Sequence, residues 1–466
     1  MSELSQNKMG TKPMLPLLLG MSLPAMFSML IQALYNVVDS IFVASYSPLA
    51  LTAVSLAMPM QMVSISFAVG TAVGVNSLIA RRLGAKNFKE ANAAATTGII
   101  LALINWILFL VIGLLFSGAF IAMFTGDSQV VEYGTQYLSI VLCVSVGMMF
   151  GNMGEKILQS TGNMILPMLS QLFGAIINII FDPLLIFGIG PFPQMGVVGA
   201  AVATVFGQIC GAVFVMVNLF VKKHAVKISF KGFKMQAQVL KNIYAVGVPA
   251  IIMQSIGSVM VSGINAIISL ADVAENLTNA YINAFGAYFK LQSFVFMPVF
   301  GLTQGTSPII GYNYGARNKK RMYSAFRIAI IIAFSILSVG FLIFQIAPEW
   351  ILSLFTSGDT AANALMLEVG VPEIRIISLS FFFAAFGIMF SALFQAVGKG
   401  VYSMILSFLR QLVVLIPAAF LLSKIDLGVI WYAFPIAEIV ALLCALVFFF
   451  RLRSREFKML DRPLEQ

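Results

Sequence analysis

Long apolar segments separated by short polar stretches make up most of this 466-residue sequence. Each segment is long enough to cross a hydrocarbon layer about 30 Å thick as an α-helix. The pattern therefore predicts an all-α integral membrane protein with twelve transmembrane helices, at approximately residues 14–44, 52–80, 93–123, 129–157, 164–189, 195–221, 240–270, 278–312, 322–347, 364–395, 401–423 and 428–450.

Composition excludes a soluble globular protein. Hydrophobic residues make up 60% of the chain and charged residues only 10%, whereas a soluble domain has about 25% charged residues. The first apolar segment lacks a small-residue cleavage site and is too long for a signal peptide, so it is expected to be retained. All three cysteines, Cys143, Cys210 and Cys444, fall inside apolar segments. No disulfide framework or clustered metal site is therefore expected.

The basic residues are concentrated in alternate connections between the segments. Most Lys and Arg residues lie near the N-terminus, in residues 81–89, at Lys156, in residues 222–241 and 317–327, or after Phe450. The positive-inside rule then places both termini in the cytoplasm of a multi-pass protein. The net charge of +10 is explained by topology, so we expect contact with the lipid bilayer and no nucleic-acid partner.

An internal repeat divides the chain into two halves. The motif Arg82-Leu-Gly84-Ala85-Lys86-Asn87 recurs as Tyr314-Gly315-Ala316-Arg317-Asn318, at an offset of 231 residues. Six helices in each half preserve orientation, which predicts two pseudo-symmetric six-helix lobes around a central cavity. The predicted parts are an N-terminal lobe, a basic cytoplasmic linker, a C-terminal lobe and a basic cytoplasmic tail, at residues 1–221, 222–239, 240–450 and 451–466.

Asp39 is an acid inside the first apolar segment. A charged side chain in a bilayer costs at least about 2.5–3.5 kcal/mol, so such acids usually face a protein interior and mark an ion or substrate path. Gln32, Tyr35 and Asn36 are three or four residues from Asp39 or from one another. Helical spacing places these polar groups on one side of the helix. A purely structural polar patch is the alternative interpretation.

Asp182 is a second acid, in the fifth segment, and Asn178 precedes it by one helical turn. The corresponding positions of the second half are Ala418 and Ala419, so this acid pair belongs to the N-terminal lobe alone. Pro183 follows Asp182 and frees a carbonyl group of the preceding turn. It either kinks the helix or contributes to the site.

The C-terminal half has a different set of embedded charges. Lys290 and Arg410 are deep within their segments and are candidates for salt bridges or for a cavity lining, whereas Glu438 lies in the last segment. Glu373 and Arg375 are nearer a segment end, where their side chains could reach the membrane interface.

No catalytic motif is recognisable. The sequence has no Gly-x-Ser-x-Gly, His-Glu-x-x-His or nucleotide-binding Gly-x-x-x-x-Gly-Lys-Ser/Thr pattern, and its one histidine, His224, lies in the predicted linker. We expect a protein that is not an enzyme, needs no cofactor and draws energy from an ion gradient.

Several motifs resemble the multidrug and toxic compound extrusion (MATE) family. They are Leu23-Pro24, Asn36-x-x-Asp39-x-x-Phe-Val, Arg82-Leu-Gly84-Ala85, Gln159-x-x-Gly162 and Asn178-x-x-x-Asp182-Pro183. The resemblance covers nearly the whole chain and is closest to the bacterial branch that contains a DNA-damage-inducible member and staphylococcal-type exporters. It implies a secondary antiporter in the bacterial plasma (inner) membrane that exports cationic or amphipathic drugs in exchange for H⁺ or Na⁺.

The resemblance also implies roles for individual residues. The cation-coupling site would comprise Asp39, Asp182, Asn178, Asn36, Tyr137 and Asn152, with Na⁺ at Asp39 and Asp182 as one possibility. Gln32 and Tyr35 match substrate-cavity positions, and Pro24 matches the proline about which the first helix bends. We expect Gln254, Phe285 and Lys290 to form the opposing cavity wall in the C-terminal lobe.

An alternative cargo fits the same architecture. A flippase or exporter of lipid-linked or polysaccharide cargo would share the two lobes, but it would need a strongly cationic cavity for phosphate groups. Only Lys290 and Arg410 are candidates for such a cavity. We therefore favour drug export. The protein is expected to be a monomer, and H⁺ is preferred over Na⁺ as the coupling ion.

Overall fold

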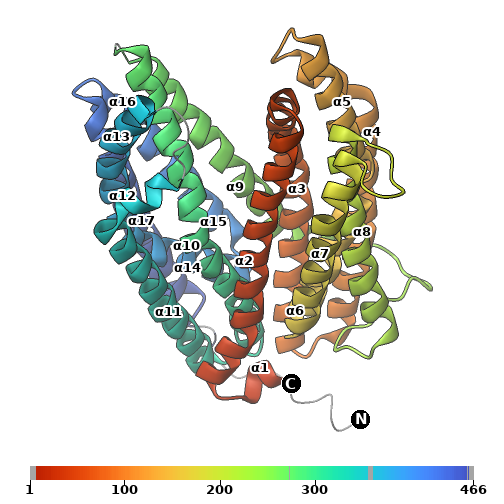
Figure 1. Ribbon diagram of the computed structural model, residues 1–466. Coiled ribbons are helices and arrows are strands. Elements are labelled where there is room, and N and C mark those ends of the chain that lie inside the picture. Colours follow the sequence, from red (N-terminus) through yellow and green to blue (C-terminus); the bar gives the residue numbers. More distant parts are fainter. Residues whose placement is uncertain (1–6, 272, 355–359, 459, 461–466) are drawn as a thin grey trace.

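A computed structural model describes residues 7–271, 273–354, 360–458 and 460. The regular elements among these residues are all helical (Figure 1). Those of the first half are α1 (Lys8–Thr11), α2 (Met14–Tyr46), α3 (Pro48–Gly84), α4 (Phe88–Ala122), α5 (Ser128–Cys143), α6 (Val146–Ser160), α7 (Ile165–Phe187) and α8 (Gly196–Val221). Those of the second half are α9 (Ala237–Ser269), α10 (Glu275–Gly315), α11 (Lys319–Ile346), α12 (Pro348–Ser353), α13 (Thr360–Ser378), α14 (Phe381–Ala396), α15 (Gly400–Phe408), the π-helix η1 (Leu409–Leu415), α16 (Ile416–Ser423), the 3₁₀ helix η2 (Leu427–Tyr432) and α17 (Ala433–Arg455).

The described chain has ten to twelve candidate membrane spans, in line with the twelve predicted. Ten helical stretches are long and apolar enough to cross a membrane. The number is twelve when the pairs α5–α6 and α13–α14, bent by 42° and 51° respectively, each count as one span. The breaks lie at equivalent places in the two halves, which supports the internal repeat, although the apolar pattern predicted straight helices there.

Ordinary end signals position the helices. Ser47 accepts a hydrogen bond from the backbone N–H of Leu49 at 3.2 Å, and Pro48 occupies the first turn of α3. Both residue types favour a helix start. Asp127 caps α5 in the same way through the N–H groups of Gln129 and Val130. Helix α7 ends at Gly188, whose φ of 71° suits glycine.

Each half of the chain forms a lobe with its own core. One buried cluster draws mainly on helices α3–α8, and the other on helices α9–α17. Residues 222–236 connect the lobes without forming a helix, and α9 begins at Ala237. Helix α2 contributes to both cores, because Met21 is buried with the C-terminal lobe and Val43 with the N-terminal lobe.

The internal repeat has a matching backbone conformation. Lys86 and Arg317, 231 residues apart, both have positive φ, at 57° and 54°. The next residues, Asn87 and Asn318, each cap the following helix by accepting a backbone hydrogen bond at 3.1 Å. A positive φ is uncommon for residues other than glycine. Its recurrence at equivalent positions supports two copies of one helix–turn–helix unit.

The two lobes meet closely at the end of the molecule that carries the termini (Figure 1). Gly84 packs against the carbonyl group of Tyr312, and Gly315 packs against that of Arg81. A side chain at either glycine would collide with the backbone of the other lobe. The repeated motif is therefore also the closed contact between the lobes.

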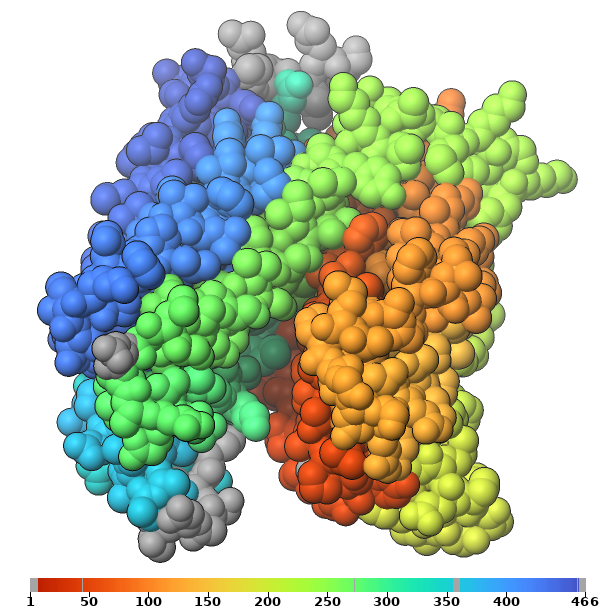
Figure 2. Space-filling view, turned by 90° about the horizontal axis from the view of Figure 1, so that it is seen from above, coloured from red at the N-terminus to blue at the C-terminus, as the bar shows by residue number. Residues whose placement is uncertain are grey.

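Further glycines extend this contact along two helix pairs. Gly70 of α3 lies against Ile251 of α9, and Gly305 of α10 lies against Ser22 of α2. Small residues allow helix backbones to approach closely in membranes. Beyond these contacts the lobes diverge, and Figure 2, viewed into the open end, shows a hollow between the N-terminal lobe in red and orange and the C-terminal lobe in green and blue.

Candidate functional site

Two acidic side chains meet inside the N-terminal lobe. Asp39 of α2 and Asp182 of α7 lie within hydrogen-bonding distance of each other. Asp182 is completely buried, and Asp39 is half-buried. One carboxylate oxygen of Asp39, Oδ1, is buried and has no hydrogen-bond partner among the described residues. The contact between these two predicted residues is the centre of the candidate site.

Helix packing creates this contact. The second half of α2 leans on the N-terminal lobe, where Val43 is buried. Helix α8 packs on the face of α7 that carries Gly174 and Asn178, and Gly207 of α8 approaches the carbonyl group of Gly174 so closely that an added Cβ would be 2.6 Å from its oxygen. Asp182 lies one turn after Asn178, so this close approach of α7 and α8 buries the edge of the site on which both residues lie.

Asn178 supports Asp182 from the preceding turn. Its Nδ2 donates to Asp182 Oδ1 at 3.3 Å. With the amide turned over, Nδ2 donates to Oδ2 of Asp182 at 3.1 Å and the amide oxygen accepts from the backbone N–H of Thr204 at 3.2 Å. The second orientation satisfies both ends of the amide, so we favour it. In either orientation Asn178 holds the Asp182 carboxyl group in place.

Two tyrosines border the acid pair. Tyr35 lies one turn before Asp39 on α2, and Tyr137 is buried on α5. Both are close enough to interact electrostatically with the two acids. Tyr137 also hydrogen-bonds Gln61 of α3. Both tyrosines were predicted from the sequence, but Gln61 was not, because it lies in an apolar segment without a charged neighbour.

Paired carboxyl groups define what this site can do chemically. Two ionised carboxylates in contact repel each other, and the surrounding low dielectric strengthens that repulsion. A proton shared between them, or a small cation bound by their oxygens, removes the conflict. Carboxylate and amide oxygens suit either ion, so the donor set fits H⁺ and Na⁺ alike.

Three further residues of the N-terminal lobe were predicted for the site: Gln32, Asn36 and Asn152. Gln32 and Asn36 are exposed on α2, and their roles in the substrate cavity and the cation site, respectively, stay predictions. Asn152 donates to the carbonyl group of Met148 at 2.9 Å within α6. Its membership of the cation site stays a prediction.

Pro24 lies inside α2, close to the point where the helix passes from one lobe to the other. Proline removes the backbone hydrogen bond to the carbonyl of residue 20, which is a glycine with open space beside it. Ser28 donates its hydroxyl to the carbonyl of Pro24 at 3.1 Å, a bond that favours helix bending. The local chemistry therefore weakens α2 at this position.

A polar cavity of about 240 Å³ lies in the C-terminal lobe and includes the predicted residue Gln254. Arg410 and Glu438 also line it and form a salt bridge of 2.9 Å. Arg410 lies in the π-helix η1, and π-helical turns often occur at functional sites. Of the two roles left open for Arg410, the structure shows both a salt bridge and a cavity lining.

Phe285 and Lys290, both predicted to line the cavity wall of the C-terminal lobe, differ in their exposure. Phe285 is only 1% exposed and packs edge-on against Phe289, with Trp431 5.2 Å away between ring centres. In the described conformation it belongs to the interior of the C-terminal lobe, and its contact with substrate stays a prediction. Lys290, on the same helix, is exposed.

Glu373 also differs from expectation. Its position near a segment end allowed the side chain to reach the membrane interface, but it is completely buried in α13 and both carboxylate oxygens lack a partner among the described residues. Its neighbours explain the error, because α13 packs against α10 and η2 as well as α11. The sequence could not supply this information.

Lys156 was grouped with the basic connections, yet it is buried in α6 at 8% exposure. Its ammonium group donates to Gln159 of the same helix and to Gln304 of α10, each at 2.8 Å. Gln159 donates to Gln304 as well, at 3.2 Å. These three side chains form a polar bridge between the lobes on their closed side.

The chain is similar to known proteins both in sequence and in fold. A family model described as MatE matches residues 24–184 and 255–421. The chain is 27% identical over 437 residues to the multidrug export protein MepA of Staphylococcus haemolyticus (strain JCSC1435), covering 93% of each protein. The fold matches a solved structure described as the outward-facing conformation of a multidrug resistance MATE family transporter of the MOP superfamily, with a TM-score of 0.88, 28% identity and coverage of 99% of this chain and 98% of that chain.

A second solved structure is that of a MOP superfamily transporter from Pyrococcus furiosus, whose description states that reverse polarity of its binding pocket suggests a different function. It matches with a TM-score of 0.88 and 29% identity, over 99% of this chain and 98% of that chain.

The fold and these relationships define a two-lobed secondary transporter of the membrane, which is not an enzyme. The match spans well over half of the chain. The protein belongs to the MatE family, as its motifs predicted, and it is related to the staphylococcal exporters of that family.

Proposed function

We propose that this protein is an antiporter that exports cationic or amphipathic drugs across the bacterial plasma membrane in exchange for H⁺ or Na⁺. The observation that carries the proposal is the buried contact between Asp39 and Asp182, which leaves a carboxylate oxygen without a partner. The repulsion between two adjacent carboxylates favours the binding of a proton or a cation, and it is relieved once that ion is bound. H⁺ is the preferred ion, because one proton shared between the two adjacent carboxyl groups needs no full coordination shell.

The orientation follows from the basic residues. Both termini and the closed contact between the lobes lie at one end of the molecule (Figure 1). With the termini in the cytoplasm, as the positive-inside rule requires, the hollow opens outward. The described conformation then corresponds to the state that releases drug and takes up the coupling ion.

Ion binding would change the conformation through α2. Neutralising Asp39 weakens its attraction for a cationic drug and removes the repulsion across the contact with Asp182. The first part of α2 is anchored in the C-terminal lobe and the second part in the N-terminal lobe. Bending near Pro24 would let the second part respond to the ion while the first part stays in place.

The available driving force is sufficient. Each charge that crosses a membrane potential of 100 mV supplies about 2.3 kcal/mol. This free energy corresponds to a drug gradient of about 50-fold per charge. The potential drives export of a cationic drug only when more positive charges enter as coupling ions than leave with the drug; a one-for-one exchange of monovalent cations relies on the concentration gradient of the coupling ion alone.

Phosphate-bearing cargo is less well supported. Arg410, one of two cationic candidates for a cavity, is already neutralised by Glu438 at 2.9 Å. An anionic cargo would have to displace this partner.

We expect Asp39→Asn to reduce ion-driven uptake of a fluorescent organic cation into everted vesicles at least about tenfold, because one coupling carboxylate is lost. The vesicles would be energised in turn by a pH gradient and by a Na⁺ gradient, and protein level would be matched. Glu132→Gln is the control, since Glu132 is an exposed acid of the same lobe that bonds only to Gln136 among the interactions described. Ion-driven uptake by Asp39→Asn at the wild-type rate would contradict the proposal.

A further inference from the structure

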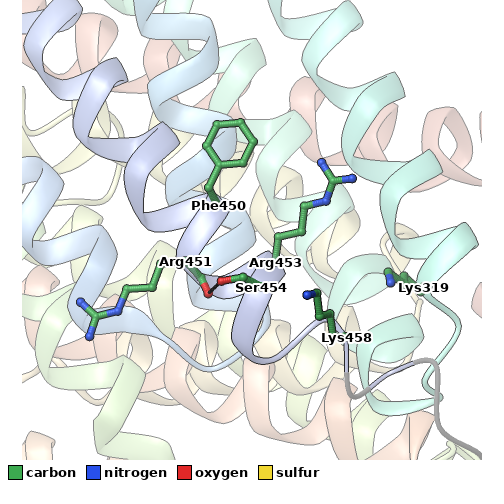
Figure 3. A pocket seen from close by; sticks show the side chains of 6 residues that line it. All are labelled: Lys319, Phe450, Arg451, Arg453, Ser454 and Lys458. Carbon is green, nitrogen blue, oxygen red and sulfur yellow. Dashed lines mark hydrogen bonds between the residues drawn. The ribbon is translucent and has the colours of Figure 1, made fainter.

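A basic pocket lies where α17 ends and α11 begins, on the side of the molecule that carries the termini. Its volume is about 720 Å³, and Figure 3 shows the side chains that line it: Lys319, Phe450, Arg451, Arg453, Ser454 and Lys458. We call this the tail pocket. None of its lining residues takes part in the site between Asp39 and Asp182.

The tail pocket has a one-sided charge. Four of its six lining residues are Lys or Arg, and none is acidic. Glu456 belongs to the same end of the chain, but it is ion-paired with Lys399 at 2.5 Å and accepts a hydrogen bond from Tyr314 at 3.4 Å. Glu456 is therefore directed to other partners, and among the described residues that line the tail pocket the excess of positive charge suits an anion.

An apolar stripe runs along α17 to this pocket. Leu443, Val447 and Phe450 are spaced at i, i+4 and i+7 and are 59%, 63% and 56% exposed. This spacing places them on one face of the helix. Exposed apolar side chains on a membrane-spanning helix face lipid chains, and Phe450 also lines the tail pocket. The stripe and the basic residues together match a molecule with an anionic head and apolar tails.

We propose that the tail pocket binds the phosphate headgroup of an anionic phospholipid, whose acyl chains lie along the stripe of α17. Arg453 and Lys458 lie on the same side of α17 in Figure 3 and would contact the phosphate, because a guanidinium group bonds phosphate oxygens in pairs and an ammonium group adds a second positive charge. A soluble phosphate would use the charge but leave the stripe without a role. Basic pockets at membrane edges bind anionic headgroups in this way. The assignment to the cytoplasmic leaflet rests on the proposed orientation, whereas the site itself does not.

The site belongs to one moving body. Helices α11 and α17 both contribute to the core of the C-terminal lobe, through Ala329 and Ala445 for example. A lipid in the tail pocket therefore stays with this lobe while the lobes rock against each other.

The test measures lipid binding to the purified full-length protein by native mass spectrometry in a neutral detergent. Phosphatidylglycerol and phosphatidylcholine with identical acyl chains are the lipid probes, and glycerol phosphate is the soluble anion. Arg453→Gln with Lys458→Gln removes two charges from the side of the tail pocket that would hold the phosphate. Lys222→Gln with Lys223→Gln is the matched control, because it removes two exposed charges from the connection between the lobes.

We expect phosphatidylglycerol to bind the wild type and the control more tightly than phosphatidylcholine does. The tail-pocket variant should lose about 30-fold in affinity for phosphatidylglycerol, at about fivefold per basic residue. If the double variant cannot be purified, Arg453→Gln alone should lose about fivefold.

Three results would overturn the proposal. The first is equal binding of both lipids to the wild type. The second is an equal loss of affinity in the control variant, which would indicate general attraction to a basic protein. The third is binding of glycerol phosphate as tight as that of phosphatidylglycerol, which would assign the tail pocket to a soluble anion. None of these results bears on export through Asp39, so the two proposals fail separately.

Discussion

At the scale of single residues, the buried acids of the two lobes have different surroundings. Asp182 has Asp39 and the amide of Asn178 as neighbours. Glu438 is paired with Arg410. Glu373 has no partner for either oxygen among the described residues. A buried polar group without a partner costs free energy. Asp39 and Glu438 each leave one buried oxygen without a partner, so Glu373, which leaves two, carries the larger cost.

We expect Glu373→Met to raise the melting temperature by several degrees, because methionine fills a similar volume without burying an unpaired polar group. Thermal unfolding followed by circular dichroism measures the change. Glu368→Met is the control, since Glu368 is exposed on the same helix and its replacement should have little effect. A lower melting temperature for Glu373→Met would mean that its carboxyl group has a stabilising partner after all, such as a bound ion.

At the scale of helices, α2 links the proposed coupling site to the contact between the lobes. Its first part packs on α10 through Ser22 and Gly305, and its second part carries Asp39. Pro24, with Gly20 one turn earlier and Ser28 one turn later, weakens the helix between these two parts.

Pro24→Ala should restore a backbone hydrogen bond and stiffen α2. We expect the transport rate to fall severalfold while the affinity for drug, measured by fluorescence polarisation, changes little. Pro249→Ala is the matched control because Pro249 is the counterpart of Pro24 in the repeat, on α9, which carries no acid at the position of Asp39. An equal loss of rate in both variants would show that neither proline has a special role in coupling.

Much of this organisation could be predicted from the sequence. A carboxylate in an apolar run is conspicuous, so Asp39 and Asp182 were identifiable without coordinates. The breaks after Cys143 and Ser378, and the π-helix around Arg410, were not predicted. They arise from tertiary packing within segments whose apolar pattern is continuous.

The neighbours of individual side chains were the feature least predictable from the sequence. From the sequence, Lys156 was assigned to a polar connection between helices. In the structure it is bonded to Gln304, which belongs to the other half of the chain and could not be identified as its neighbour from the sequence. Phe285 is equally apolar whether it faces a cavity or Trp431. Hydrophobicity along the sequence identifies burial but does not name the partner that provides it.

At the scale of the whole molecule, a rocking transporter must separate the contacts that close one side. Lys156, Gln159 and Gln304 bridge the lobes there by hydrogen bonds of 2.8–3.2 Å. Opening this side would break the bonds to Gln304 and expose Lys156 to water.

A covalent bridge at this place should stop transport. After replacement of the native cysteines, Gln159→Cys with Gln304→Cys would be linked by a short reducible reagent. We expect transport to be lost on linking and recovered on reduction. The control is Glu155→Cys with Gln171→Cys, a hydrogen-bonded pair at 2.6 Å within the N-terminal lobe, judged by the effect of linking relative to its own reduced form. Full transport by the linked Gln159–Gln304 protein would exclude opening of the lobes at this side.

The most direct test of the central claim is the ion movement driven by drug in liposomes that contain only this protein. An imposed gradient of an organic cation should drive H⁺ or Na⁺ in the opposite direction, recorded with a pH-sensitive or Na⁺-sensitive dye. Asp182→Asn should abolish this counterflow because it removes one member of the acid pair, whereas Glu373→Gln in the other lobe should retain it. Counterflow that persists in Asp182→Asn but disappears in Glu373→Gln would contradict coupling through Asp39 and Asp182.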